Sequence, residues 1–447
     1  MSDAEPQVQQ TEPLPADQVH SAAQHEIGNE QSADGAAPTN SFEDLTDVRA
    51  IPRVSIQAFC ESDAVSSVIE RASGDRRMAK AHVRLESGGI PAATAYYQTA
   101  TTPNLIILES HLTGDELIGQ LQGLAQVCDE GSNVLIIGHE NDVQLYRNLI
   151  SRGVAEYLVA PISMVELMNV INELFVNPDS EPLGNTMAFV GAKGGVGSST
   201  IAHNVAFSIS DRFQSDVLLV DMDLPFGTAN IDFDQDPERG VADAVFSADR
   251  VDDTYLDRLM AKCTDHLSLL AAPSTLDNEY DFGPDDFRQV LDVAQRGTPN
   301  VVLDIPHLWT GWAKTVLTGA DKVIITATPD LASLRNAKNL IDTLSELRPN
   351  DQKPTLVLNQ VDVPKRPEIS VADFADPLGI DPEIVIPFDP ALFGMAANNG
   401  QMIVEADPKS EIAASFDILA QVLTGRREIQ EQPKATSFFS MFRRNKK

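Results

Sequence analysis

The stretch Met-Ala-Phe-Val-Gly-Ala-Lys-Gly-Gly-Val-Gly-Ser-Ser-Thr at residues 187–200 joins an apolar strand to a helix through a glycine-rich turn. Because glycine has no Cβ, such a turn can direct several backbone N–H groups inward. Together with the N-terminus of the helix expected over about 199–210, these groups form a cradle for polyphosphate. A tight strand-to-helix turn without a ligand is the alternative. The apolar stripe of the helix, suited to packing on a sheet, is Ile201, Ala202, Val205, Ala206 and Ile209.

The loop departs from the ordinary phosphate loop, G-x-x-x-x-G-K-[ST]. Ala192 stands at the first glycine position and Ser198 at the lysine position, so the only lysine of the loop is Lys193. A lysine at the start of the loop resembles the deviant phosphate loop of the ParA/MinD ATPases. The resemblance implies ATP as nucleotide, a homodimer, and a catalytic role for Lys193 at the nucleotide of the second protomer. Without a lysine at position 198, we expect weak or absent hydrolysis.

Two further apolar strands end in aspartates. Asp221 and Asp223 follow the strand 217–220, and Asp304 ends the strand 301–303. Because parallel strands carry ligands at their carboxyl ends, these side chains are expected at the same sheet edge as the loop. The resemblance implies that Asp223 positions the attacking water and that Asp221 supports the loop and the magnesium shell. Asp304 fits a Walker-B-type carboxylate that holds Mg²⁺ through water. For Asp221 and Asp223, the alternative is that a strand-end aspartate caps a helix.

The remaining nucleotide contacts come from the same resemblance. Ser199 is expected as the direct hydroxyl ligand of Mg²⁺, and Thr200 near the α-phosphate. Asn359, at the end of a strand, is implied to read the adenine edge, and the segment 386–389 resembles an "IPxD" run that lines the base. A rigid turn is the alternative for that run. The expected nucleotide-binding residues are Gly194, Gly195, Val196, Gly197, Ser198, Ser199, Thr200, Asn359, Pro387 and Asp389.

An earlier block, residues 51–176, also alternates strands and helices, which predicts a parallel, flavodoxin-like sheet. The run 154–161 resembles the close of a response-regulator receiver domain. The receiver's phosphoacceptor Asp is replaced by Glu109, its lysine by Ala160 and its Ser/Thr by Gly138. We therefore expect an atypical receiver that takes no phosphoryl group and serves as a docking or dimerisation surface. Glu109 is expected as a solvated carboxylate at a strand end, with a metal site as the alternative.

The chain of 447 residues is expected to contain two doubly wound α/β units, a flavodoxin-like receiver-type domain followed by a deviant-Walker P-loop NTPase domain. The expected division is an acidic disordered arm at 1–50, a receiver-like domain at 51–176, a linker at 177–185, an ATPase domain at 186–425 and a basic aromatic tail at 426–447. This order resembles the CpaE/TadZ branch of the ParA/MinD superfamily. The resemblance implies a role in placing or assembling Flp-type (tight adherence) pili, with pilus assembly and secretion proteins as partners.

Charge bears on one of the two alternatives to this function. The formal net charge of −33 opposes non-specific binding to duplex DNA, so no nucleic acid is expected and a DNA-partitioning ATPase is disfavoured. A nucleotide-free docking scaffold stays open as a second alternative.

The sequence shows no signal-peptide pattern and no apolar stretch of 18 residues, which predicts a cytoplasmic protein, polar or peripheral at the inner membrane. Near the end, residues 436–447 place phenylalanines beside arginines and lysines. Such a segment predicts weak peripheral membrane contact, with partner docking and a disordered end as alternatives.

Overall fold

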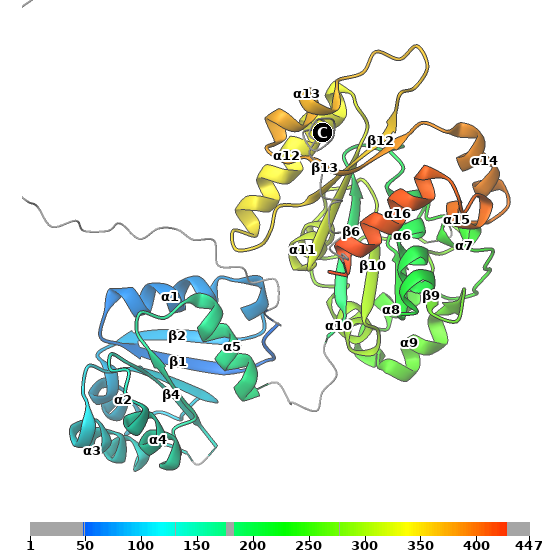
Figure 1. Ribbon diagram of the computed structural model, residues 1–447. Coiled ribbons are helices and arrows are strands. Elements are labelled where there is room, and N and C mark those ends of the chain that lie inside the picture. Colours follow the sequence, from blue (N-terminus) through cyan, green and yellow to red (C-terminus); the bar gives the residue numbers. More distant parts are fainter. Residues whose placement is uncertain (1–47, 49, 130, 176–182, 277, 427–447) are drawn as a thin grey trace, which may run out of the picture. The chain divides into compact units, whose positions relative to one another are not determined.

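The computed structural model describes residues 48, 50–129, 131–175, 183–276 and 278–426. Within these residues the strands form two separate sheets (Figure 1). Most of the acidic arm expected at 1–50 lies outside the described residues. So do most of the expected linker and the expected tail after Arg426, so these expectations stay predictions. Among the described helices, none combines the length and apolar character needed to cross a membrane.

The first sheet has five strands in the described residues, all parallel, in the order β2-β1-β3-β4-β5. This is the flavodoxin-like order, so the predicted fold class is confirmed for this block. The strands are β1 (Ser55–Cys60), β2 (His82–Ser87), β3 (Leu105–Glu109), β4 (Asn133–Gly138) and β5 (Glu156–Val159). The helices are α1 (Asp63–Ser73), the short 3-10 helix η1 (Arg76–Met78), α2 (Gly89–Tyr97), α3 (Gly114–Ala125), α4 (Val143–Ser151) and α5 (Met164–Phe175).

Helix α2 begins within the pair of glycines Gly88-Gly89, which follows β2. Gly88 lies just before the helix with a φ of 113°, a left-handed conformation that suits glycine. The two glycines therefore turn the chain from β2 into a helix. That helix buries Ile90, Ala93 and Tyr97 against the sheet.

Eight strands form the second sheet within the described residues, in the order β13-β12-β11-β6-β10-β7-β9-β8. All neighbours are parallel except the edge pair β8 and β9, and the two-residue strand β8 is not predicted from the sequence. The strands are β6 (Asn185–Gly191), β7 (Val217–Asp221), β8 (Ala261–Lys262), β9 (Leu267–Leu270), β10 (Asn300–Ile305), β11 (Lys322–Ala327), β12 (Thr355–Val361) and β13 (Pro382–Pro387). A parallel sheet covered by helices confirms the predicted class of this block.

Helices cover both faces of the second sheet. Along β6, Met187 and Phe189 belong to one apolar cluster, and Ala188 and Val190 to the other, because successive side chains point to opposite faces. The cluster that contains Met187 and Phe189 also includes residues of α6 and α16, and these two helices pack together (Figure 1). The apolar stripe predicted for α6 is fully buried. The helices are α6 (Ser198–Phe213), α7 (Ala229–Asp232), α8 (Val241–Phe246), η2 (Ala248–Arg250), α9 (Asp253–Leu259), α10 (Arg288–Gly297), α11 (Gly311–Gly319), α12 (Leu331–Leu347), α13 (Val371–Ala375), η3 (Asp376–Leu378), α14 (Pro390–Asn398), α15 (Ile403–Ala406) and α16 (Glu411–Leu423).

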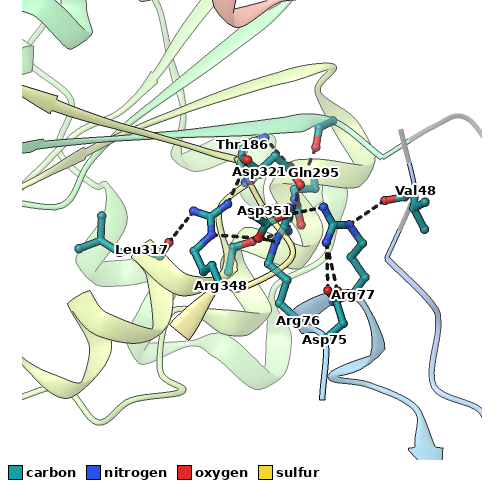
Figure 2. Close-up of polar contacts among 12 residues, drawn as sticks. Val48, Asp75, Arg76, Arg77, Thr186, Gln295, Leu317, Asp321, Arg348 and Asp351 are labelled. Carbon is teal, nitrogen blue, oxygen red and sulfur yellow. Dashed lines mark hydrogen bonds and ion pairs between the residues drawn. The ribbon is translucent and has the colours of Figure 1, made fainter. Parts of the chain in front are cut away.

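Figure 2 shows a group of ion pairs around Asp351, shortly after α12. Its carboxylate lies 3.0 Å from Nε of Arg348, 2.8 Å from Nε of Arg76 and 2.6 Å from Nη2 of Arg77. Burial alone would raise the pKa of Asp351, but the nearby guanidinium groups, that of Arg76 first, hold it below its ordinary value. Asp321, also in Figure 2, accepts hydrogen bonds from Thr186 at the start of β6. The group thus adjoins the strand beginnings, opposite the edge where the glycine loop lies.

The space beside Gly138 explains why this position carries no hydroxyl side chain. A Cβ built on Gly138 would lie 2.1 Å from Oη of Tyr157, whose hydroxyl donates to the carbonyl oxygen of Glu140 at 2.8 Å. The tyrosine therefore fills the position next to the end of β4.

We expect Gly138→Thr to lower the free energy of unfolding by about 1–3 kcal/mol, because the new side chain collides with Tyr157 in a packed region. Urea denaturation of the full chain measures the change. Gly123→Thr in α3 is the control, since a Cβ there meets no atom within 4 Å. A Gly138→Thr protein as stable as its control would contradict the packing described.

Candidate functional site

The glycine-rich loop follows the end of β6, and α6 begins at Ser198. Gly195 and Gly197 have φ values of 80° and 88°, in the left-handed region that favours glycine. A Cβ on Gly197 would also lie only 2.6 Å from Nδ2 of Asn359. Both backbone conformation and space therefore require glycine at position 197, and the loop adopts the turn that the sequence predicts.

Two side chains that follow one another in β12 hold this loop. Nδ2 of Asn359 donates to the carbonyl oxygen of Val196 at 2.8 Å, and Nε2 of Gln360 donates to that of Gly195 at 3.1 Å. The structure thus brings Asn359 to the loop, where its amide group fixes the loop backbone. Its contact with adenine stays a prediction. The role of Gln360 was not predicted from the sequence, although its place directly after Asn359 was visible.

The "IPxD" segment lies beside β12, since β13 is the next strand of the sheet. Pro387, the last residue of β13, is exposed. The backbone N–H of the next residue, Phe388, donates to the carbonyl oxygen of Val361. Asp389 caps α14 by accepting from the backbone N–H of Leu392 at 3.0 Å. A helix cap of this kind is what the alternative of a rigid turn implies. Binding of a base by Pro387 and Asp389 stays a prediction.

The loop lysine has a partner within its own chain. Nζ of Lys193 lies 2.5 Å from Oδ2 of Asp330, which caps α12 and also accepts from Oγ1 of Thr328. Burial alone would raise the pKa of Asp330. Its hydrogen bonds with Lys193 and Thr328 have the larger, opposite effect, and the pKa lies at about 2. Asp330 was not singled out in the sequence. Its position shortly after β11, at the same strand-end edge as the loop, was the available signal.

The predicted strand-end carboxylates meet beside the loop. Neighbouring strands β7 and β10 are in a register that places Asp221 opposite Asp304, and both side chains are buried. Oδ1 and Oδ2 of Asp221 accept from the backbone N–H groups of Asp223 and Ala229, each at 3.1 Å. Burial first, and then the charge of Asp304, raise the pKa of Asp221 to about 7. Asp223 is only partly buried, and burial raises its pKa as well.

A buried histidine, which the sequence analysis missed, completes this cluster. His203 lies on α6 with its Nδ1 2.7 Å from Oδ2 of Asp232 and its Nε2 3.4 Å from Oδ2 of Asp304. Burial lowers the pKa of His203, but the two carboxylates, Asp232 before Asp304, outweigh this and raise it to about 10. The histidine is therefore a cation beside carboxylates at neutral pH. Within the apolar stripe of α6 it resembles an ordinary core residue.

Two buried atoms of the site fit a magnesium–triphosphate group. Among the described residues, neither Oδ1 of Asp304 nor Oγ of Ser198 has a hydrogen-bond partner. Ser199 and Thr200 lie partly exposed in the first turn of α6, where backbone N–H groups and the helix dipole favour phosphate. A Cβ on Gly194 or Gly195 would meet no atom within 4 Å, so the loop opens to free space there. Hydroxyl and carboxylate oxygens are the donors that Mg²⁺ prefers.

Comparison with known proteins gives a consistent result. A family described as "AAA domain" matches residues 184–357. The septum site-determining protein MinD of Bacillus subtilis (strain 168) is 24% identical over 265 residues, covering 56% of this chain and 95% of that protein. The solved structure of a ParA family ATPase from Chlorobium tepidum TLS is 26% identical, covering 53% of this chain and 98% of its own, with a TM-score of 0.49.

Matches to pilus assembly proteins are higher in sequence identity. The solved structure of a pilus assembly protein CpaE from Caulobacter crescentus CB15 is 40% identical and covers 29% of this chain and 98% of its own, with a TM-score of 0.28. The ATPase matches and the pilus-protein match thus occur in the same chain.

Proposed function

Since the chain belongs to the CpaE-type ParA/MinD ATPases, we propose that it binds ATP with Mg²⁺ and acts as a nucleotide-linked homodimer that localises or assembles the Flp-type (tight adherence) pilus machinery. The observation that supports it most is the glycine loop beside Asp304, whose buried Oδ1 has no partner among the described residues. A buried carboxylate oxygen without a partner is unfavourable unless a cation or a hydrogen-bond donor satisfies it.

In this proposal each part of the site has one task. The backbone N–H groups of Gly195, Val196 and Gly197 bind phosphate oxygens, while Ser199 and Asp304 hold the magnesium ion. The bound ion supplies positive charge that neutralises the phosphates. Asp221 fixes the loop that carries Asp223, and Asp223 orients the attacking water. Hydrolysis is weak or absent because Ser198, where other phosphate loops carry lysine, brings no charge to the β- and γ-phosphates.

Lys193 has to change partners for the dimer to form. Its ammonium group now pairs with Asp330, and its side chain keeps 36% of its exposure, so it is accessible to a second protomer. In the dimer the phosphates of the partner's nucleotide replace Asp330. An ion pair at a partly exposed site contributes about 1 kcal/mol or less, so this exchange is energetically small.

The pilus machinery is proposed as partner because the related Caulobacter protein is described as a pilus assembly protein. We place the protein in the cytoplasm, at a pole or peripheral to the inner membrane. The net charge of −33 disfavours the alternative of a DNA-partitioning ATPase.

Sedimentation of the full chain tests the dimer. With ATP and Mg²⁺ we expect the wild-type protein to sediment as a dimer, and Lys193→Ala to stay monomeric while its ATP affinity changes less than about threefold, because the lysine serves the other protomer's nucleotide. The control Lys409→Ala changes an exposed lysine on the chain segment before α16 and should dimerise normally.

Three outcomes would contradict the proposal. A wild-type protein that stays monomeric at saturating ATP would remove the nucleotide-linked dimer. Normal dimerisation of Lys193→Ala would remove the role of the lysine. Normal surface piliation in cells that carry only Lys193→Ala would show that the dimer is not what the pilus machinery requires.

A further inference from the structure

The first sheet carries a second group of polar side chains at its own carboxyl edge. Glu109 ends β3 and is completely buried, whereas the sequence predicts a solvated carboxylate there, so that prediction is wrong. Its Oε2 accepts from the backbone N–H groups of Glu61 and Ser62 at 2.8 and 2.7 Å, and its Oε1 from Oγ of Ser62 at 2.6 Å. Burial alone would raise the pKa of Glu109, but these hydrogen bonds outweigh burial and hold the pKa below its ordinary value. The carboxylate is therefore ionised.

Two histidines face this fixed carboxylate from neighbouring strand ends. Nε2 of His139, directly after β4, lies 3.2 Å from Oε1 of Glu109, and the rings of His139 and His111 stack with centroids 3.8 Å apart. The ligand atoms offered by Glu109, His111 and His139 all lie within 4.8 Å of one another. Since Zn²⁺ lies about 2.1 Å from nitrogen and oxygen ligands, a small shift of the exposed side chains brings all three atoms within reach of one ion.

A fourth possible ligand comes from the end of β1. Nδ1 of His111 lies 2.9 Å from Oε2 of Glu61. Glu61 can approach the edge because residue 89 is glycine: a Cβ there would lie 2.3 Å from its Oε1. The group therefore has two imidazoles and two carboxylates, and the side chains of Glu61, His111 and His139 remain 28, 56 and 33% exposed, which leaves an entry path for an ion.

We propose that Glu109, His111 and His139, with Glu61 as fourth ligand, form a binding site for Zn²⁺. Two histidine nitrogens and two carboxylate oxygens are a common tetrahedral zinc set, whereas Mg²⁺ selects oxygen ligands. The backbone N–H groups that hold Glu109 act as the outer hydrogen bonds that orient a metal ligand. The ion would join three strand ends of the first sheet. This site is independent of the nucleotide site proposed above.

Zinc titration of the full-length protein tests the proposal. After treatment with a chelator and without nucleotide, calorimetry with ZnCl₂ should show one site per chain that MgCl₂ at equal concentration does not occupy. His111→Ala should weaken zinc binding at least about tenfold, because loss of even an outer hydrogen-bond partner of a metal ligand costs about that much. His111 is largely exposed, so this variant should keep the fold, and its thermal unfolding without metal provides the check.

A matched control separates the site from general binding by surface histidines. His266, in the part of the chain that forms the second sheet, also pairs with a carboxylate, since its Nδ1 lies 2.7 Å from Oδ1 of Asp216. The variant His266→Ala should bind zinc as the wild type does. Glu61→Gln gives a second test that leaves the buried Glu109 intact. Co²⁺ bound at the site should show the visible absorption of a tetrahedral ion, lost in His111→Ala.

Either of two results would overturn the proposal. Zinc binding that is absent, or equal in the wild type, His111→Ala and Glu61→Gln, would show that the histidines only form hydrogen-bonded pairs with the carboxylates. Equal binding of Mg²⁺ at the same residues would show that the chemistry of the site is not that of zinc. Neither result would affect the ATP site, which is measured separately.

Discussion

Replacing Gly197 by valine is expected to lower the affinity for ATP at least about 30-fold, or roughly 2 kcal/mol. Gly197 has a φ of 88°, a conformation that strains a β-branched residue, and a Cβ at this position would lie 2.6 Å from Nδ2 of Asn359. The loop therefore has to move, and its N–H groups leave the positions in which they bind phosphate. Calorimetric titration of the variant with ATP and Mg²⁺ measures the loss.

The control for this variant is Gly379→Val. Gly379 also has a positive φ, of 63°, but it ends η3, away from the loop, and its nearest contact for a Cβ is Nζ of Lys353 at 3.5 Å. This variant should lose some stability and keep its ATP affinity. If both variants bound ATP as the wild type does, the loop would not be the phosphate site.

His203→Gln is expected to lower the free energy of unfolding by on the order of 3 kcal/mol near pH 7 when nucleotide and Mg²⁺ are absent. The imidazolium is buried between Asp232 and Asp304, and without it these carboxylates keep like charges in a buried site. The control His266→Gln changes a more exposed histidine whose partner Asp216 is also exposed, and it should have an effect below about 1 kcal/mol.

The pH dependence of this effect has a definite sign. The pKa of His203 is raised from 6.5 to about 10 on folding, so its stabilising contribution is complete below pH 6.5 and is lost as the pH rises through about 10. The difference in unfolding free energy between wild type and His203→Gln should therefore be largest at pH 6 and small near pH 10. A difference that is the same at both pH values would show that only the packing of the ring matters.

Much of the site could be predicted from the sequence because it follows from strand ends. Asp221 and Asp304 each end an apolar run, and parallel strands of one sheet bring such ends together, so their pairing was expected. The glycine loop was predictable for a similar reason, since glycines at 195 and 197 permit the left-handed conformations observed. These inferences need only the local pattern and the rule for parallel sheets.

The interactions missed by the sequence analysis join residues distant in the chain. His203 looks like part of an apolar stripe, and only the fold shows Asp232 and Asp304 on either side of it. Glu109 looks like a solvated strand end, and its burial depends on N–H groups of Glu61 and Ser62, which precede it by almost fifty residues. Charge and burial of such groups are properties of the tertiary contacts.

Titration of the full-length protein with ATP tests the nucleotide site most directly. With Mg²⁺ present, we predict saturable binding of one ATP per chain, weakened by Asp304→Ala, because the carboxylate that helps to hold the ion is then missing. The same titration without Mg²⁺ should show much weaker binding. If the wild-type protein bound no ATP at millimolar concentration with Mg²⁺, the chain would share the ATPase fold without its ligand.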